Sequence, residues 1–223
     1  MSGGTRFSRI SLLNIHVPQE AIAVYRQILR SCLPFSVVAV ALWACSAPGS
    51  VTDSSDRGAS LSSSSDAPDP TTNTSLTALR EATARFQRFE EATAPGLYST
   101  KVTPCWAHHS AGAMGYHYGK MDLFDANVEL LAPEVLMYEP QPGGHMQLVG
   151  MEYIVPIDAW QNAGHDVNNP GDRPQLLGQT FTQHSFLPIY KLHIWLWRVN
   201  PQGTYADWNP KVGCDAAADK EIF

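Results

Sequence analysis

The chain has 223 residues, of which 44% are hydrophobic and 16% are charged, a composition typical of a globular protein with about one domain. Residues 46–223 carry 11 basic and 20 acidic side chains, a net charge of −9. An acidic domain without clusters of Lys and Arg argues against a protein that binds nucleic acid through its phosphates.

The first 45 residues have the pattern of an export signal. Arg26 and Arg30 precede an apolar run, residues 33–45, which at 13 residues is too short for a mature transmembrane helix. The run ends in Leu42–Trp43–Ala44–Cys45, which resembles the bacterial lipobox, although Trp43 is bulkier than usual. We expect a membrane-anchored lipoprotein of the bacterial cell envelope, periplasmic or extracellular, with lipidated Cys45. The alternative is an ordinary cleaved signal in which this cysteine has no role.

Residues 46–74 are predicted to form a disordered linker rich in Ser and Pro. Its central part, residues 62–70, has almost no apolar surface to bury. The expected role of this linker is to hold a single globular domain, residues 75–223, away from the membrane.

An amphipathic helix is predicted at the start of that domain. Ser75 suits the N-cap position, and Pro95–Gly96 ends the segment. The apolar residues at helical spacing gather close to one face, and they are Leu76, Leu79, Phe86 and Phe89.

The chain after Tyr98 has mostly the patterns of β-strands. Short strands are predicted over residues 114–118, 135–139, 146–155 and 190–199. Residues 140–144, Pro-Gln-Pro-Gly-Gly, form a strong turn signal, so the second and third strands are expected to pair as a hairpin. The predicted fold class is therefore α+β, with an N-terminal amphipathic helix packed on a mainly antiparallel β-sheet.

Only two cysteines, Cys105 and Cys214, remain after the predicted signal. In an oxidising compartment such an isolated pair is most simply a disulfide, which here would join the start of the domain to its end. The alternative is a pair of thiolate metal ligands, which is disfavoured because no C-x-x-C spacing is present.

Three polar residues lie within apolar predicted strands, namely His117, Glu152 and His193. Buried polar groups need partners, and two imidazoles with one carboxylate are the ligands of many Zn and non-haem Fe sites. We therefore expect these residues to bind a divalent metal ion, with Trp195 and Trp197 on the strand face of His193 forming a dry wall. The alternative is that they bond to one another or to the backbone and only order the core.

The remaining polar residues carry weaker signals. Glu139 is an additional metal ligand if its side chain points inward, and Glu134 is interpreted as a charge at a strand end. The other residues are expected to lie in loops, in turns or in solvent, and they are His108, His109, His145, His165, His184 and Asp207. The motifs of serine hydrolases, nucleotide-binding loops and zinc proteases are absent from the sequence.

Several segments together resemble a group of exported bacterial proteins of unknown function. They are GAMGYHY (112–118), PEVLMYEP (133–140), LVGMEY (148–153), LHIWLW (192–197), NP (200–201) and WNP (208–210). The resemblance spans about residues 76–214. It implies the same domain boundary and no particular activity.

Two functions from different classes follow from these observations. The first is an extracytoplasmic domain that binds a metal ion or small ligand in the buried His/Glu cluster; whether it is an enzyme stays open. The second is a noncatalytic envelope interaction module whose partner binds an aromatic patch, and a carbohydrate binder using the same side chains ranks third. The tryptophans concerned are Trp106, Trp160, Trp195, Trp197 and Trp208.

Overall fold

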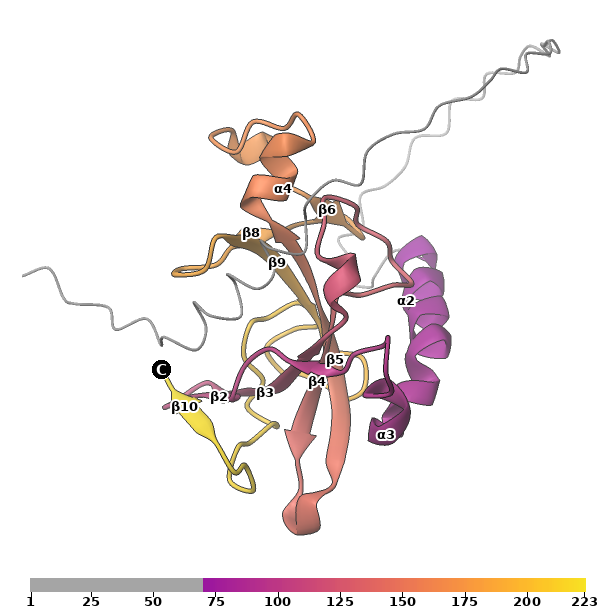
Figure 1. Cartoon of the computed structure of the whole chain (residues 1–223), viewed down its shortest axis with the longest axis vertical. Coiled ribbons are helices and arrows are strands. Elements are labelled where there is room, and N and C mark those ends of the chain that lie inside the picture. Colours follow the sequence, from indigo (N-terminus) through magenta and orange to yellow (C-terminus); the bar gives the residue numbers. More distant parts are fainter. Residues whose placement is uncertain (1–69) are drawn as a thin grey trace, which may run out of the picture.

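The computed structural model describes residues 70–223, and they form a mixed α+β fold built on a curled, mainly antiparallel sheet (Figure 1). The predicted export signal, Cys45 and residues 46–69 of the predicted linker lie outside the described residues. Within residues 70–223, no helix has both the length and the apolar character needed to span a membrane.

The N-terminal helical segment is divided into three pieces, α2 (Pro70–Thr83), η1 (Ala84–Gln87) and α3 (Phe89–Ala92). The helix begins five residues before Ser75, with a proline in the first turn, where its missing N–H costs no hydrogen bond. The break follows Thr83, whose hydroxyl donates to the carbonyl of Leu79 at 2.8 Å, a bond that competes with regular helix geometry.

The main sheet has eight strands, in the order β10-β2-β3-β4-β5-β9-β8, with β1 paired to β3. Every pairing is antiparallel except that of β10 with β2. The strands are β1 (Thr100–Lys101), β2 (Cys105–His108), β3 (Gly112–Gly119), β4 (Val135–Pro140), β5 (Met146–Pro156), β8 (Thr182–Gln183), β9 (Ile189–Ile194) and β10 (Lys220–Ile222).

Short elements fill the connections. A small separate hairpin joins β6 (Gln175–Leu176) to β7 (Gln179–Thr180). Helix α4 extends from the end of β5 and lies at the top of Figure 1. The short helices are η2 (Met121–Leu123), η3 (Pro142–Gly144), α4 (Ile157–Asn162) and η4 (Pro170–Asp172).

The predicted hairpin is confirmed, because β4 and β5 pair antiparallel across the turn at η3. Gly143 and Gly144 both have positive φ values, 83° and 84°, which favour glycine. The pairing contains a bulge at Val149, since Met137 lies opposite Gly150 while Tyr138 lies opposite Leu148. The bulge reverses the alternation of side chains along β5, so Leu148 joins the core beneath the helices and Val149 joins the core on the other face.

The two faces of the sheet are covered differently. Leu79 and Phe86 from the helical segment pack with Tyr138, Tyr153 and other sheet residues in the largest core cluster. The opposite face carries a second cluster that includes both disulfide cysteines. The predicted disulfide between Cys105 and Cys214 is confirmed, with Cα atoms 5.8 Å apart.

The C-terminal strand is shorter than the predicted 190–199, because β9 ends at Ile194. Gly150 lies so close to the Ile194 carbonyl that a Cβ atom there would be 2.8 Å from the oxygen. Beyond this point the chain leaves the ladder: Trp195 N–H donates to the carbonyl of Thr204, and Trp197 N–H donates to that of Val149.

Candidate metal centre

The structure brings together all three residues predicted to bind metal. Glu152 on β5 lies directly opposite His193 on β9, and His117 comes from β3, with β4 between. The Nε2 atom of His193 is 3.4 Å from Oε1 of Glu152, and the Nε2 atom of His117 is 3.7 Å from Oε2. The curl of the sheet closes the remaining gap, so that the two imidazoles approach one carboxylate from different strands.

The cluster is almost completely withdrawn from solvent. The exposed fraction is 1% for His117, 6% for Glu152 and 1% for His193. One possible ligand atom from each residue lies within 4.8 Å of the other two. Two ligands at 2.0–2.1 Å from a tetrahedral Zn ion lie about 3.3–3.4 Å apart. The two nitrogen–oxygen distances are therefore close to those that one ion needs.

Each imidazole is held by its Nδ1 atom and leaves its Nε2 atom facing the cluster. Nδ1 of His117 forms a 2.8 Å hydrogen bond with the Thr103 hydroxyl, and Nδ1 of His193 lies 3.2 Å from Oδ1 of Asp207. Within residues 70–223, both Nε2 atoms are buried and have no hydrogen-bond partner. A partner that fixes Nδ1 and leaves Nε2 available is the usual outer-shell arrangement of metal-binding histidines.

Burial controls the protonation of the cluster. Loss of solvent lowers the pKa of His117 well below its ordinary value, and the positive charges that His193 and His184 would carry if protonated add to this effect. Burial also raises the pKa of Glu152, although His193 and Lys191 act in the opposite direction. His117 therefore presents a neutral imidazole at pH 7, and burial disfavours the ionised form of Glu152 more than these nearby positive charges favour it.

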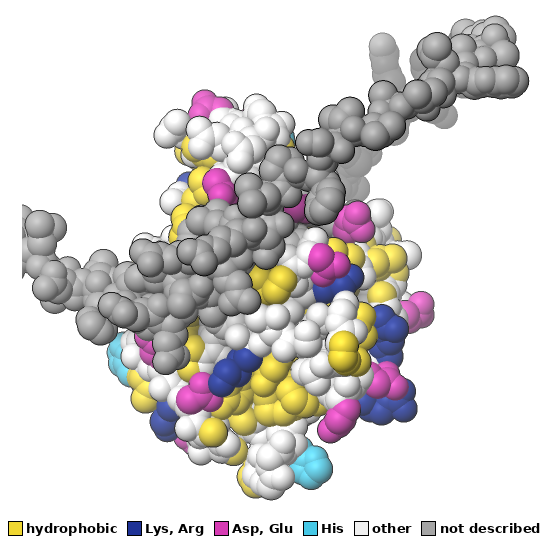
Figure 2. Space-filling view, in the orientation of Figure 1, with side chains coloured by type: hydrophobic (Ala, Val, Ile, Leu, Met, Phe, Trp, Pro, Cys, Tyr) yellow, Lys and Arg dark blue, Asp and Glu magenta, His cyan; other side chains and the backbone are white. Residues whose placement is uncertain are grey.

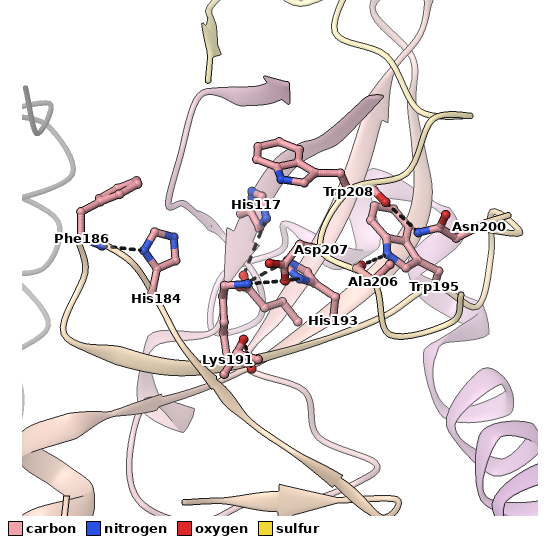
Figure 3. A network of polar contacts seen from close by, with 12 residues as sticks. His117, His184, Phe186, Lys191, His193, Trp195, Asn200, Ala206, Asp207 and Trp208 are labelled. Atoms are coloured by element: carbon pink, nitrogen blue, oxygen red, sulfur yellow. Dashed lines mark hydrogen bonds and ion pairs between the residues drawn. The ribbon is translucent and has the colours of Figure 1, made fainter. Parts of the chain in front are cut away.

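Asp207 is part of this arrangement and is not merely a turn residue. Its carboxylate lies beside Nδ1 of His193 and also accepts a hydrogen bond from the ammonium of Lys191 (Figure 3). The hydrogen bond with His193, the positive charge of Lys191 and related contacts lower the pKa of Asp207, so the group stays ionised. An ionised carboxylate bonded to Nδ1–H fixes the tautomer in which Nε2 carries a free lone pair.

The sequence analysis missed Thr103, Asp207, Lys191 and His184 as parts of the site and its surroundings. A signal for Asp207 was present: Lys191 precedes His193 by two residues in an apolar strand, and a buried lysine needs a carboxylate. No local signal pointed to Thr103, since its role depends on β1 lying beside β3.

The prediction that His184 is solvated is wrong. Its side chain is buried, and its Nδ1 atom accepts the backbone N–H groups of Phe186 at 3.4 Å and Leu187 at 3.3 Å. Burial lowers its pKa to about 4, so the ring is neutral at pH 7 and carries its proton on Nε2.

Neither of the two additional glutamates belongs to the cluster. Glu139 points inward but pairs with Arg198 and accepts the N–H of Gly213 at 2.9 Å, so it is not a metal ligand. Glu134 is buried rather than a solvated strand-end charge, and its carboxylate accepts the N–H of Ile154 at 3.0 Å. Burial raises its pKa to about 8.

The other histidines stand apart from the cluster. The rings of His108 and His109 stack at 4.3 Å, and His108 accepts backbone N–H groups from the following turn. His145 is exposed in the β4–β5 turn. His165 lies half-buried against Trp160 and bonds to the Asp172 carboxylate at 2.9 Å.

The five tryptophans named above are distributed over several regions. Trp106 and Trp195 are buried, and Trp195 stacks near His193 with ring centroids 6.2 Å apart. Trp197 does not lie beside His193. Its indole N–H donates to the Thr83 hydroxyl, because the chain leaves β9 at Ile194. Trp160 and Trp208 are half-buried, and Trp160 donates to the carbonyl of Asp172.

Comparison of the chain with protein-family models, with curated proteins and with solved structures found no match.

Proposed function

We propose that this domain binds a divalent transition-metal ion, Zn or Fe, through His117, Glu152 and His193. The observation that carries the proposal is the pair of buried Nε2 atoms that face one buried carboxylate with no hydrogen-bond partner among the described residues. A cation would accept both nitrogen lone pairs and offset the buried negative charge. No rearrangement of the strands is needed for this, because one ligand atom from each residue already lies within 4.8 Å of the others.

A purely structural role accounts less well for the cluster. Hydrogen bonds within the core would satisfy the imidazole nitrogens, as they do for the Nδ1 atoms, yet the two Nε2 atoms are left over. Leaving a buried polar atom unsatisfied costs about 1–3 kcal/mol. Two such atoms that both approach one carboxylate are the arrangement expected of a metal site.

Three protein ligands leave at least one coordination position open. This is typical of catalytic Zn sites and of non-haem Fe sites with two histidines and one carboxylate. Such an ion acts as a Lewis acid and lowers the pKa of bound water, so metal-assisted hydrolysis and dioxygen chemistry are the first activities to test. The residues of this chain hold the two imidazoles at Nδ1 through Thr103 and Asp207, which leaves both Nε2 atoms facing the cluster.

The proposal is tested by measuring metal content in the full-length protein. After chelation and reconstitution with Zn or Fe(II), mass spectrometry of elements should find close to one ion per wild-type chain. The variants His193→Ala and His117→Ala should retain almost none, whereas His145→Ala, which removes an exposed histidine, should match the wild type. A folded wild-type protein that binds no ion, or a His193→Ala variant with full metal content, would contradict the proposal.

The positions of the tryptophans favour a metal site over an interaction module built on an aromatic patch. Two of them are buried, and two others use their indole N–H groups inside the fold. On the face shown in Figure 2, most Lys and Arg side chains lie next to acidic ones, and no basic patch is seen there.

We further propose that the chain is an exported bacterial lipoprotein, related to the proteins of unknown function that its motifs resemble, and that lipid-modified Cys45 anchors it in the membrane. The disulfide supports export, because such bonds persist in oxidising compartments. In bacteria fed labelled palmitate, the wild type should carry label and partition into detergent, while Cys45→Ala should do neither. An unlabelled, water-soluble wild type would indicate the ordinary cleaved signal instead.

A further inference from the structure

A cavity of about 270 Å³ adjoins the candidate metal centre. It shares residues with the surroundings of the cluster: Asp207 lines the cavity and holds His193, and Trp106 lines it with its ring centroid 5.5 Å from that of His117. A molecule bound in this cavity would therefore lie against the residue that holds His193 and against one that packs on His117.

Aromatic side chains from four separate segments form one wall of the cavity. The indole of Trp106 lies 6.0 Å from Phe186 and 5.3 Å from Phe223, measured between ring centroids. Phe223 lies 5.9 Å from Trp208 and follows directly after β10, whose parallel pairing with β2 brings it here. These rings offer flat apolar surface of the kind on which another planar ring stacks.

Polar groups gather at one part of the cavity lining. The ammonium of Lys191 has three donors, of which one is used by Asp207. His184 carries its proton on Nε2, because its Nδ1 atom accepts two backbone N–H groups, and this residue lines the same cavity as Lys191. An oxygen anion placed here would receive donors from both side chains.

The volume suits a small aromatic ligand. An apolar cavity of about 150 Å³ holds one benzene molecule, so this larger cavity has room for one ring with a small substituent. A sugar would need polar partners around its whole ring, whereas one wall of this cavity is formed by the four aromatic rings.

We propose that the cavity binds a single-ring aromatic carboxylate, with its ring against Trp106, Phe186 and Trp208 and its carboxylate toward Lys191 and His184. The proposal rests on the metal site for the charge that favours an anion. A divalent ion held at the cluster would add two positive charges close to the cavity, on the side where Lys191 and Asp207 line it. Binding of the carboxylate should accordingly be stronger in the metal-loaded protein.

Benzoate is the probe for this proposal, titrated into full-length protein with and without Zn while heat and tryptophan fluorescence are recorded. Benzoate should bind the Zn-loaded protein at least about tenfold more tightly than the metal-free protein, by Coulomb attraction in a partly buried site. Cyclohexanecarboxylate tests the need for a planar ring, benzyl alcohol tests the need for charge, and N-acetylglucosamine tests a carbohydrate site. Each of these three should bind more weakly than benzoate.

The variant Trp208→Leu should weaken benzoate binding about fivefold, as loss of one aromatic contact predicts, with unchanged metal content. Trp160→Leu is the matched control, because it also removes a half-buried tryptophan but one outside the cavity, and it should change neither quantity. The proposal would be overturned if the Zn-loaded wild type does not bind benzoate, or if it binds cyclohexanecarboxylate or the sugar as tightly as benzoate. A protein that binds no Zn would instead refute the metal site.

Discussion

Removing the disulfide should lower the free energy of unfolding by about 4–5 kcal/mol, because the bond closes a loop with a sequence separation of 109 residues. Without the bond, the unfolded chain has more conformational entropy, because the loop is no longer closed. This would be a large part of the stability of an ordinary domain, which is about 5–15 kcal/mol. The measurement is urea denaturation of the double variant Cys105→Ala, Cys214→Ala beside the wild type.

Reduced wild-type protein provides the control, because it lacks the bond but leaves no cavity in the core around the two cysteines. Both samples should lose similar stability, and both should show a steeper dependence on urea, since an unlinked chain exposes more surface when unfolded. A loss below about 1 kcal/mol in the reduced wild type would show that the bond does not act through the unfolded state.

Replacing Glu152 with Gln should raise the stability of the metal-free domain by about 1–2 kcal/mol at pH 8 and abolish metal binding. The reason is that burial disfavours the ionised carboxylate of Glu152 more than the nearby Lys191 favours it, and functional groups of this kind are commonly held at a cost in stability. Excess Zn should reverse the order, because a ligand at 100 times its Kd stabilises the folded state by about 2.7 kcal/mol. Denaturation with chelator and with Zn measures both effects.

The pH dependence of this difference follows from the raised pKa of Glu152 in the folded state. The folded protein binds this proton more tightly than the unfolded chain does. The domain therefore becomes less stable as the pH rises above the pKa that Glu152 has in the unfolded chain and through the pKa that it has in the folded protein. The gain from Glu152→Gln should consequently be smaller at pH 5 than at pH 8.

Glu139→Gln is the matched control for the Glu152 variant. It also removes the charge of a buried glutamate, but this one is paired with Arg198 and bonded to the Gly213 N–H. It should therefore destabilise the domain. If Glu152→Gln also destabilises the metal-free protein, the carboxylate is a structural hydrogen-bond acceptor and the metal proposal loses its main support.

Local patterns in the sequence predicted which helices and strands form better than they predicted the residues at which these elements begin and end. The β4–β5 hairpin followed from its turn, and the mainly antiparallel α+β fold with its disulfide is confirmed. The helical break after Thr83 involves a distant contact as well as the local bond of Thr83 to Leu79, since the Tyr138 hydroxyl donates to the Phe86 carbonyl at 2.7 Å. The early end of β9 likewise depends on the close approach of Gly150, and strand β10 was missed because its partner lies over 100 residues earlier.

Local patterns likewise predicted the three candidate metal ligands, but they did not predict how these residues come together. His117, Glu152 and His193 could be identified because they are polar residues in apolar segments, and an apolar segment indicates a buried strand. Their convergence depends on the order of the strands and on the curl of the sheet, which no short segment specifies. Thr103 and Asp207 come from irregular segments, whose positions are set by the strands around them.

The ligands come from β3, β5 and β9, and the carboxylate that orients His193 follows later at Asp207. No contiguous part of the chain shorter than this span contains a complete site. If the protein crosses a membrane as an unfolded chain, as the proposed export signal implies, it reaches the far side without a metal ion. The metal it acquires would then reflect the supply outside the cytoplasm, and cells starved of Zn or Fe in their growth medium should accumulate the empty form.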